Sequence, residues 1–167
     1  MSRVVVMNNR LYTDEFSNRV THGSNGFTID TNEGDKCTPI GDFKFLRMYY
    51  RPDRIPHPLT NLPAAEIRPD MGWCDDSLSS QYNQEIRLPF NYGFEPLWRE
   101  DHVYDMIVVI SQNTNPIIPG KGSAIFFHIW RGPTTSTEGC VAMEQEHLLR
   151  LVRYIEPGDV VSIRQFA

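Results

Sequence analysis

Proline and glycine interrupt this chain at short intervals, and they constrain its fold more than any other feature of the sequence. The 167 residues include 12 prolines and 11 glycines. Both residue types favour turns and break helices, which argues against an all-helical bundle. Between the turns lie short runs with the composition of strands. We expect strands at residues 3–7, 10–13, 27–29, 43–50, 105–110, 123–130 and 160–163.

One convincing helix is predicted, over residues 144–155. Its apolar side chains fall on one face, and they are Leu148, Leu151, Val152 and Ile155. Glutamates near its start and arginines near its end suit the helix dipole, and Pro157-Gly158 stops it. The predicted fold class is therefore mainly β (α+β), with one or two helices.

Residues 51–100 differ from the rest of the chain. They hold seven of the 12 prolines and many aromatic residues, without a clear hydrophobic period. A stretch of this length is too long for a simple loop. We expect a long, loop-rich insertion with a functional surface, inside a single catalytic domain that covers residues 1–167.

The overall composition is that of an ordinary globular domain. Hydrophobic residues make up 40% and charged residues 22%, which excludes a mainly disordered chain, a collagen and a coiled coil. The formal net charge is -5 and no basic stripe is present, so we expect no nucleic-acid partner. We also expect a monomer.

The sequence shows no segment that would take the chain to or through a membrane. No stretch approaches the ~20 apolar residues of a membrane span, so no membrane partner is expected. The run from Val4 to Met7 is shorter than the ~7–15 apolar residues of a signal peptide. With Met at its start, the chain is expected to be cytoplasmic. A periplasmic location stays open, because an export signal could have been removed.

The chain contains three cysteines, Cys37, Cys74 and Cys140, which cannot all pair. None lies in a Cys-x-x-Cys motif, so a disulfide scaffold and a zinc cluster are both disfavoured. We expect no metal and no cofactor. Cys37 and Cys74 have no nearby base in the sequence and are interpreted as structural.

Residues 126–143 carry the most chemistry. A predicted strand ends at His128, a turn-rich loop follows, and Gly139-Cys140 comes before the predicted helix. A cysteine attacks as the thiolate and needs a base or a positive field nearby, which a loop of this length can supply by folding back. The residues alone leave an alternative open, because a buried structural cysteine and a core histidine would give the same pattern.

This segment resembles the active-site motif of the YkuD-type L,D-transpeptidase catalytic domain, in which His and a variable loop precede Ser/Thr-x-Gly-Cys. Residues 26–45 are similar to the family's early stretch, G…EGD…TP.G.F. The chain also resembles a compact branch of this family, which contains cytoplasmic L,D-carboxypeptidases. The segments that carry this likeness are residues 68–76, 82–83, 97–99 and 120–126. The likeness covers most of the chain.

The resemblance implies a YkuD-like β-sandwich catalytic domain that cleaves peptidoglycan stem peptides. Cys140 would attack the bond between the L-centre of the third residue, usually diaminopimelate, and D-alanine. His128 matches the base, and the backbone N–H groups of Gly139 and Cys140 match the oxyanion hole. Water resolves the thioester in a carboxypeptidase, whereas the amine of a second stem resolves it in a transpeptidase.

Two positions depart from the family pattern. Many members have His immediately before Gly-Cys, where this chain has Glu138, and Arg or Asn two positions after the cysteine, where it has Ala142. A carboxylate near Cys140 would raise the pKa of the thiol. We therefore expect Glu138 to point away from Cys140 or to meet a cation.

Several further residues are proposed to bind the substrate: Arg131, Trp130, Trp73, Asp75, Asp76, Tyr82 and Asn83. Arg131 could grip the terminal carboxylate or form a salt bridge that holds the loop. Trp130 could line the pocket or only pack. The run from Trp73 to Asp76, with Tyr82 and Asn83, offers carboxylates to the ammonium of diaminopimelate, although Asp and Asn also serve as turn residues.

The sequence therefore predicts a cysteine-dependent L,D-carboxypeptidase that trims stem tetrapeptides during peptidoglycan recycling. Its substrate would be a muropeptide or peptidoglycan stem peptide. Two alternatives stay open: an L,D-transpeptidase that forms 3-3 cross-links in the cell wall, and a non-catalytic peptidoglycan-binding module. Cys140 and His128 together disfavour the last.

Overall fold

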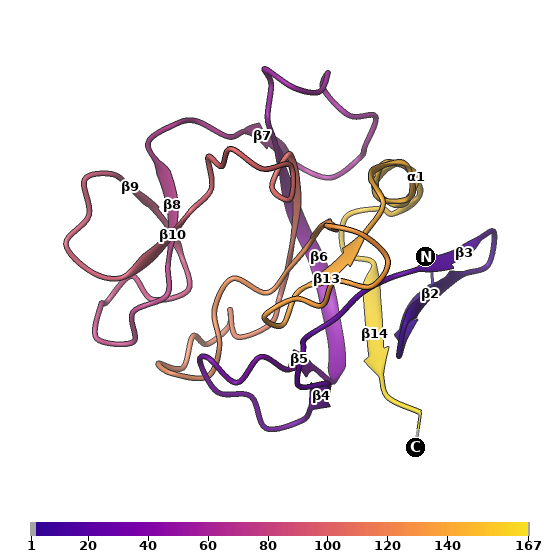
Figure 1. Ribbon diagram of the computed structural model, residues 1–167, viewed down its shortest axis with the longest axis horizontal. Helices are drawn as coiled ribbons and strands as arrows, with labels where there is room; N and C mark the ends of the chain where they lie inside the picture. Colours follow the sequence, from indigo (N-terminus) through magenta and orange to yellow (C-terminus); the bar gives the residue numbers. More distant parts are fainter. Residues whose placement is uncertain (1–2, 167) are drawn as a thin grey trace.

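The computed structural model describes residues 3–166, in which most strands gather in one large sheet (Figure 1). The sheet has nine strands in the order β13-β12-β11-β6-β14-β1-β2-β3, with β7 also paired to β6. These strands are β1 Arg3–Met7, β2 Arg10–Thr13, β3 Ser17–Arg19, β6 Gly41–Tyr50, β7 Ala64–Glu66, β11 Met106–Ile110, β12 Phe126–Ile129, β13 Val141–Met143 and β14 Val160–Arg164. A two-stranded sheet joins β4 Phe27–Thr28 to β5 Thr38–Pro39.

The predicted mainly β class is confirmed, and a strand overlaps each of the seven ranges where one was predicted. The hairpin β1–β2 turns at Asn8-Asn9, where Asn8 adopts the positive φ that such turns require. Three short strands outside the insertion were missed: β3, β5 and β13.

Helix α1 spans Gln145–Tyr154, within one residue of the prediction at each end. Leu148, Leu151 and Val152 are buried against the sheet, as their spacing requires. The structure places β13 between Cys140 and this helix, so Cys140 does not lie at the helix N-terminus. The helix dipole therefore contributes no positive field at the sulfur.

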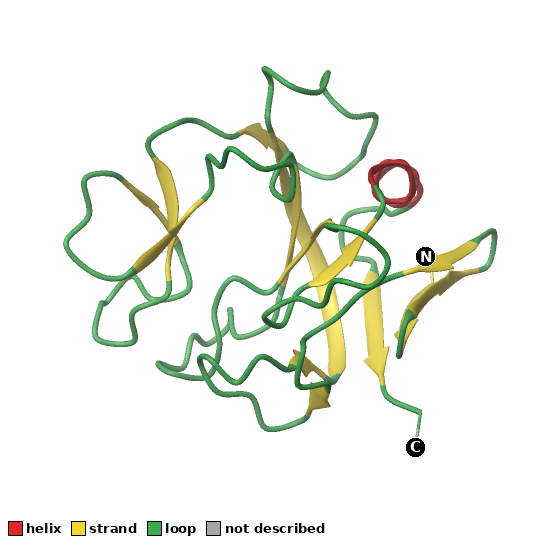
Figure 2. Ribbon diagram, viewed as in Figure 1, coloured by secondary structure: helices red, strands yellow, loops and turns green. Residues whose placement is uncertain are grey.

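The insertion, residues 51–100, is loop-rich, as predicted, but it also contains four short strands. Its segments form β7 on the edge of β6 and a separate three-stranded sheet (Figure 2). The strands of that sheet are β8 Met71–Cys74, β9 Glu85–Arg87 and β10 Phe94–Pro96. Each is only three or four residues long, which is why no period shows in the sequence.

Alternation along the central strands builds two cores, one on each face of the large sheet. In β11, Met106 and Val108 join the cluster that packs under α1, whereas Ile107 and Val109 join a cluster with the insertion. Figure 1 shows α1 and the small insertion sheet on opposite sides of β6. Cys140 belongs to the insertion-side cluster, so its side chain lies where the insertion meets the large sheet.

Candidate active site

Parallel pairing of β12 with β13 brings the predicted catalytic residues together. In this register His128 lies opposite Ala142. Cys140 comes two positions before Ala142, so it is the diagonal neighbour of His128. Residues two apart share a face, and diagonal neighbours lie within side-chain reach. Both side chains line one cleft of about 550 Å³.

Cys140 is a buried, protonated thiol. Its side chain is 8% exposed, its Sγ–H donates to the Ala124 carbonyl at 3.1 Å, and the Phe126 N–H donates to Sγ at 3.3 Å. Burial, followed by the charge of Glu95, raises the pKa of the Cys140 thiol to about 12. The thiolate must therefore form during the reaction, when substrate is present and a base accepts the proton.

His128 is fixed in the tautomer that can act as that base. Its Nδ1 lies 2.8 Å from the Ile129 carbonyl oxygen, which can only accept, so Nδ1 carries the proton and Nε2 is free. Burial, together with the positive charges of Arg131 and Arg99, lowers the pKa of His128 to about 4. The Tyr104 ring packs edge-on to the imidazole, with centroids 5.4 Å apart. The resting pair is therefore neutral, with a thiol beside an imidazole.

We expect alkylation of Cys140 by iodoacetamide to accelerate about tenfold for each pH unit from pH 7 to pH 10. A thiol of pKa about 12 is ionised to only about 10⁻⁵ at pH 7, and that fraction rises tenfold per pH unit. Peptide mapping by mass spectrometry measures the rate at this residue alone. A rate that levels off below pH 9 would indicate a thiolate already formed in the resting protein.

The turn before Cys140 is held by the Thr137 hydroxyl. Thr137 Oγ1 accepts the Gly139 N–H at 3.0 Å and donates to the Cys140 carbonyl at 2.6 Å. The predicted oxyanion role of the Gly139 N–H is therefore wrong in this structure, because that donor is already used. The Cys140 N–H has no acceptor among residues 3–166 and remains the backbone donor for an oxyanion.

Gly139 is required for its conformation and for space. Its φ is 141°, in the region that favours glycine, and a Cβ there would lie 2.8 Å from the Cys37 carbonyl oxygen. Thr38 fixes the same peptide, since its buried hydroxyl donates to the Gly139 carbonyl at 2.9 Å and accepts the Gly23 N–H at 2.8 Å. Thr38 belongs to the Thr-Pro pair within residues 26–45. This pair was the signal in the sequence that could have identified the role of Thr38.

The cleft around the pair is strongly charged. Its acidic lining residues are Glu33, Asp75, Glu95 and Glu138, and its basic ones are Lys36, Arg99 and Arg131. Of the proposed substrate-binding residues, Asp75, Trp130 and Arg131 line the cleft. Sequence analysis missed the roles of Glu33, Lys36, Glu95 and Arg99, because each reaches the cleft from a segment distant from the motif.

Four other proposed substrate-binding residues do not line this cleft. Trp73 is 2% exposed and donates its indole N–H to Asn83 Oδ1 at 2.9 Å. The same Asn83 oxygen accepts the Ala124 N–H at 3.0 Å, so Trp73 and Asn83 support the loop before β12, whose Ala124 carbonyl accepts a hydrogen bond from the Cys140 thiol. Asp76 accepts the N–H groups of Leu78 and Gly93 as a turn residue.

Tyr82 does not line the cleft but holds a residue that does. It is 1% exposed and donates its hydroxyl to Glu33 Oε1 at 2.7 Å, while Ser123 donates to the same oxygen at 2.6 Å. These two bonds fix the Glu33 carboxylate at the cleft wall. Tyr82 therefore orients a lining residue instead of touching the substrate itself.

The expectation for Glu138 is wrong. Its side chain is exposed and lines the cleft, and it forms no ion pair within residues 3–166. After burial and Glu95, its charge also contributes to the raised pKa of Cys140. Also in the cleft lining, Glu95 accepts a hydrogen bond from the Tyr104 hydroxyl, and burial raises the pKa of this carboxyl.

No group of three or more His, Cys, Asp or Glu side chains in residues 3–166 is arranged to hold a metal ion. No helix in the same range has the length and apolar character needed to cross a bilayer.

Comparisons with known proteins identify the family. The chain is similar to the crystal structure of the helical cell shape determining protein Pgp2 from Campylobacter jejuni, with 13% identity and a TM-score of 0.46. The match covers 99% of this chain and 48% of that one, so this chain spans about half its length. No curated protein sequence matches. The sequence model of the L,D-transpeptidase catalytic domain, YkuD, matches residues 2–163, and the chain therefore belongs to this family.

Proposed function

We propose that this member of a family of cysteine-dependent peptidoglycan-modifying enzymes is an L,D-carboxypeptidase. Its substrate would be a stem tetrapeptide with diaminopimelate third and D-alanine fourth. The observation that carries the proposal is the placement of Cys140 and His128 in one cleft whose volume, about 550 Å³, suits a single bound peptide.

In the acylation step, His128 Nε2 accepts the thiol proton as Cys140 Sγ attacks the carbonyl carbon of the third residue. The oxyanion forms at the Cys140 N–H. His128 then returns the proton to the amide nitrogen, the C–N bond breaks, and D-alanine leaves. The tripeptide remains attached to Cys140 as a thioester.

In the second step water resolves the thioester. His128 Nε2 accepts a proton from water, the hydroxide adds to the thioester carbon, and the tripeptide leaves with the thiol reprotonated. A transpeptidase must instead bind and orient a second stem at the same carbon.

The acidic wall supports a substrate with a free ammonium group, as the side chain of diaminopimelate has. Glu33 and Asp75 both line the cleft, and Glu33 is held by two hydroxyl donors. Burial, followed by the charge of Glu33, raises the pKa of Asp75, so these two carboxylates repel each other electrostatically. A cation between them would relieve this repulsion.

We expect purified protein to convert the tetrapeptide into tripeptide and D-alanine in equal amounts, with little dimer even when acceptor stems are in excess. Water is always present, whereas an acceptor must be bound in a site. Mass spectrometry of the products, with and without acceptor, measures the partition. The Cys140→Ser variant serves as the background control.

Two outcomes would overturn the proposal. Cross-linked dimers as the main product would indicate an L,D-transpeptidase. Binding of stem peptides without turnover would indicate a peptidoglycan-binding module. The role in cytoplasmic recycling remains a prediction, and fractionation against cytoplasmic and periplasmic markers tests it.

A further inference from the structure

Two arginines of the cleft share one carboxylate. Arg99 binds Asp101 through Nε and Nη2, at 2.8 and 2.7 Å, and Arg131 Nη2 reaches the second oxygen of Asp101 at 3.2 Å. Arg99 comes from the end of the insertion and Arg131 from the loop after His128. The Asp101 carboxylate thus holds two guanidinium groups side by side on the cleft wall.

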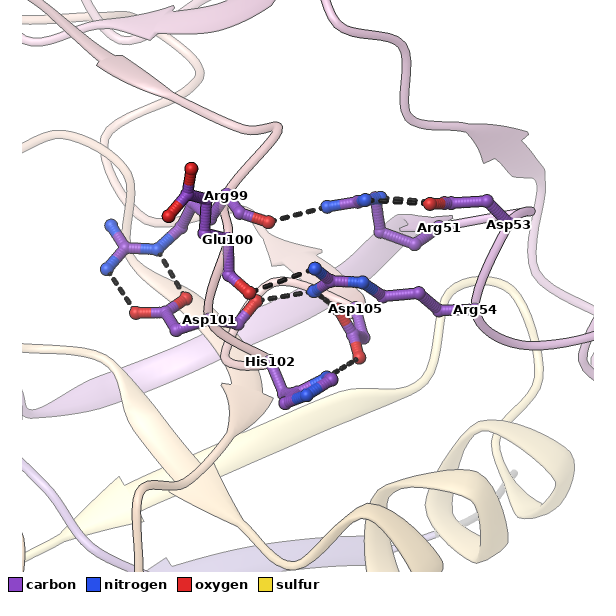
Figure 3. Close-up of polar contacts among 8 residues, drawn as sticks. All are labelled: Arg51, Asp53, Arg54, Arg99, Glu100, Asp101, His102 and Asp105. Carbon is purple, nitrogen blue, oxygen red and sulfur yellow. Dashed lines mark hydrogen bonds and ion pairs between the residues drawn. The ribbon is translucent and has the colours of Figure 1, made fainter.

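Arg51 and Arg54 hold the segment that carries Arg99 and Asp101, as Figure 3 shows. Arg51 is 4% exposed, and its guanidinium carbon lies 3.5 Å from the Trp98 ring centroid. Arg51 also donates to the Arg99 carbonyl at 2.6 Å. Arg54 donates to the Glu100 carbonyl at 2.9 Å and to the Asp101 carbonyl at 2.6 Å. It also forms a salt bridge with the buried Asp105. Every backbone carbonyl of this segment is therefore held, and the guanidinium groups stand on a rigid support.

The two arginines keep unused donors. Within residues 3–166, Nη1 of Arg99 and both Nε and Nη1 of Arg131 have no hydrogen-bond acceptor. Two positive charges against the one negative charge of Asp101 leave an excess of one positive charge. Planar donors of this kind, with excess positive charge, are suited to bind a carboxylate.

The position of these charges matches one end of the substrate. Arg131 follows β12, the strand that carries His128, by two residues, and both Arg99 and Arg131 line the same cleft as His128. Their positive charges also act electrostatically on His128. His128 protonates the departing nitrogen, and the carboxylate of a leaving amino acid is attached to the carbon next to that nitrogen. The leaving carboxylate therefore falls on the arginine side of the cleft.

We infer that Arg99 and Arg131, oriented by Asp101, bind the free carboxylate of the departing D-amino acid and so restrict cleavage to the last residue of the stem. This inference rests on the proposed function and deepens it.

The test compares a tetrapeptide ending in free D-alanine with the same peptide ending in D-alaninamide. We expect wild-type kcat/KM for acylation to be about 10- to 100-fold lower for the amide, the usual effect of losing charge-assisted hydrogen bonds. Arg99→Gln and Arg131→Gln should each lower kcat/KM for the free acid about tenfold, mainly through KM, and lower kcat/KM for the amide much less. Arg87→Gln, at an exposed insertion arginine, should change neither.

Asp101 is a positioning residue, and Asp101→Asn tests it. We expect the preference for the acid over the amide to fall while kcat/KM for the amide is kept, because a merely structural defect would lower both substrates equally. Thermal melts of all variants check that each is folded.

The outcomes separate this inference from the proposed function. Equal acylation by acid and amide, or a preference that survives both arginine substitutions, would overturn the carboxylate site and leave the proposed function standing. Absence of an acyl-enzyme with either peptide would overturn the proposed function and the inference with it.

Discussion

Replacing Cys140 with serine is expected to abolish release of D-alanine, with a loss of more than about 10³-fold in kcat. The serine hydroxyl can keep the hydrogen bonds that Sγ makes with Ala124 and Phe126, so the fold should be retained. It is nevertheless a much weaker nucleophile at neutral pH with the same base. A coupled assay for free D-alanine measures the effect.

Cys37→Ser is the matched control. Cys37 is half-buried, and its thiol bonds only to backbone carbonyls of the early loop, so we expect this variant to keep its activity. Near-normal activity in Cys140→Ser, or its loss in Cys37→Ser alone, would show that the nucleophile has been misassigned.

His128→Ala is expected to slow acylation by about 10²- to 10⁴-fold, the usual contribution of a positioned acid–base group. The thiol pKa of about 12 makes this dependence strong, since little thiolate exists without a base. Single-turnover mass spectrometry measures the rate of acyl-enzyme formation. His147→Ala changes a helix residue outside the cleft and should have little effect. An unchanged rate in His128→Ala would require another group to activate Cys140.

The parts of the fold that could be predicted are those with strong local patterns. Residues 105–110 and 160–163 are β-branched runs bounded by turns, and residues 144–155 have a clear helical face. The missed strands are short and depend on partners that are distant in the sequence. Strand β13, for example, exists because it pairs in parallel with β12 and because its Ala142 forms an antiparallel bridge with Thr21.

The insertion sheet was hidden for a further reason. All four residues of β8 are buried, including Gly72, so the strand shows no alternation of apolar and polar residues. Strand β10 ends in Pro96. Both features conceal a strand in a segment already rich in proline and aromatic residues.

Within the site, the local motif predicted that Cys140 and His128 lie close together, and both line one cleft because β12, the loop and β13 bring them into register. Trp73 and Asn83 were misassigned because a polar or aromatic residue in a turn-rich segment looks like a binding residue until its burial is known. Arg99 could not be linked to Arg131 in advance, since their shared partner Asp101 lies 30 residues from Arg131. Such contacts arise from tertiary packing.

In the proposed mechanism, Cys140 carries the tripeptide as a thioester that water resolves. Rapid mixing of wild-type protein with the stem tetrapeptide, followed by an acid quench and peptide mapping by mass spectrometry, tests for this thioester. We predict a transient adduct of one tripeptide acyl group on Cys140, which decays as free tripeptide appears. An adduct on Cys37 or Cys74 instead, or turnover with no adduct on Cys140 at any time, would rule out this mechanism.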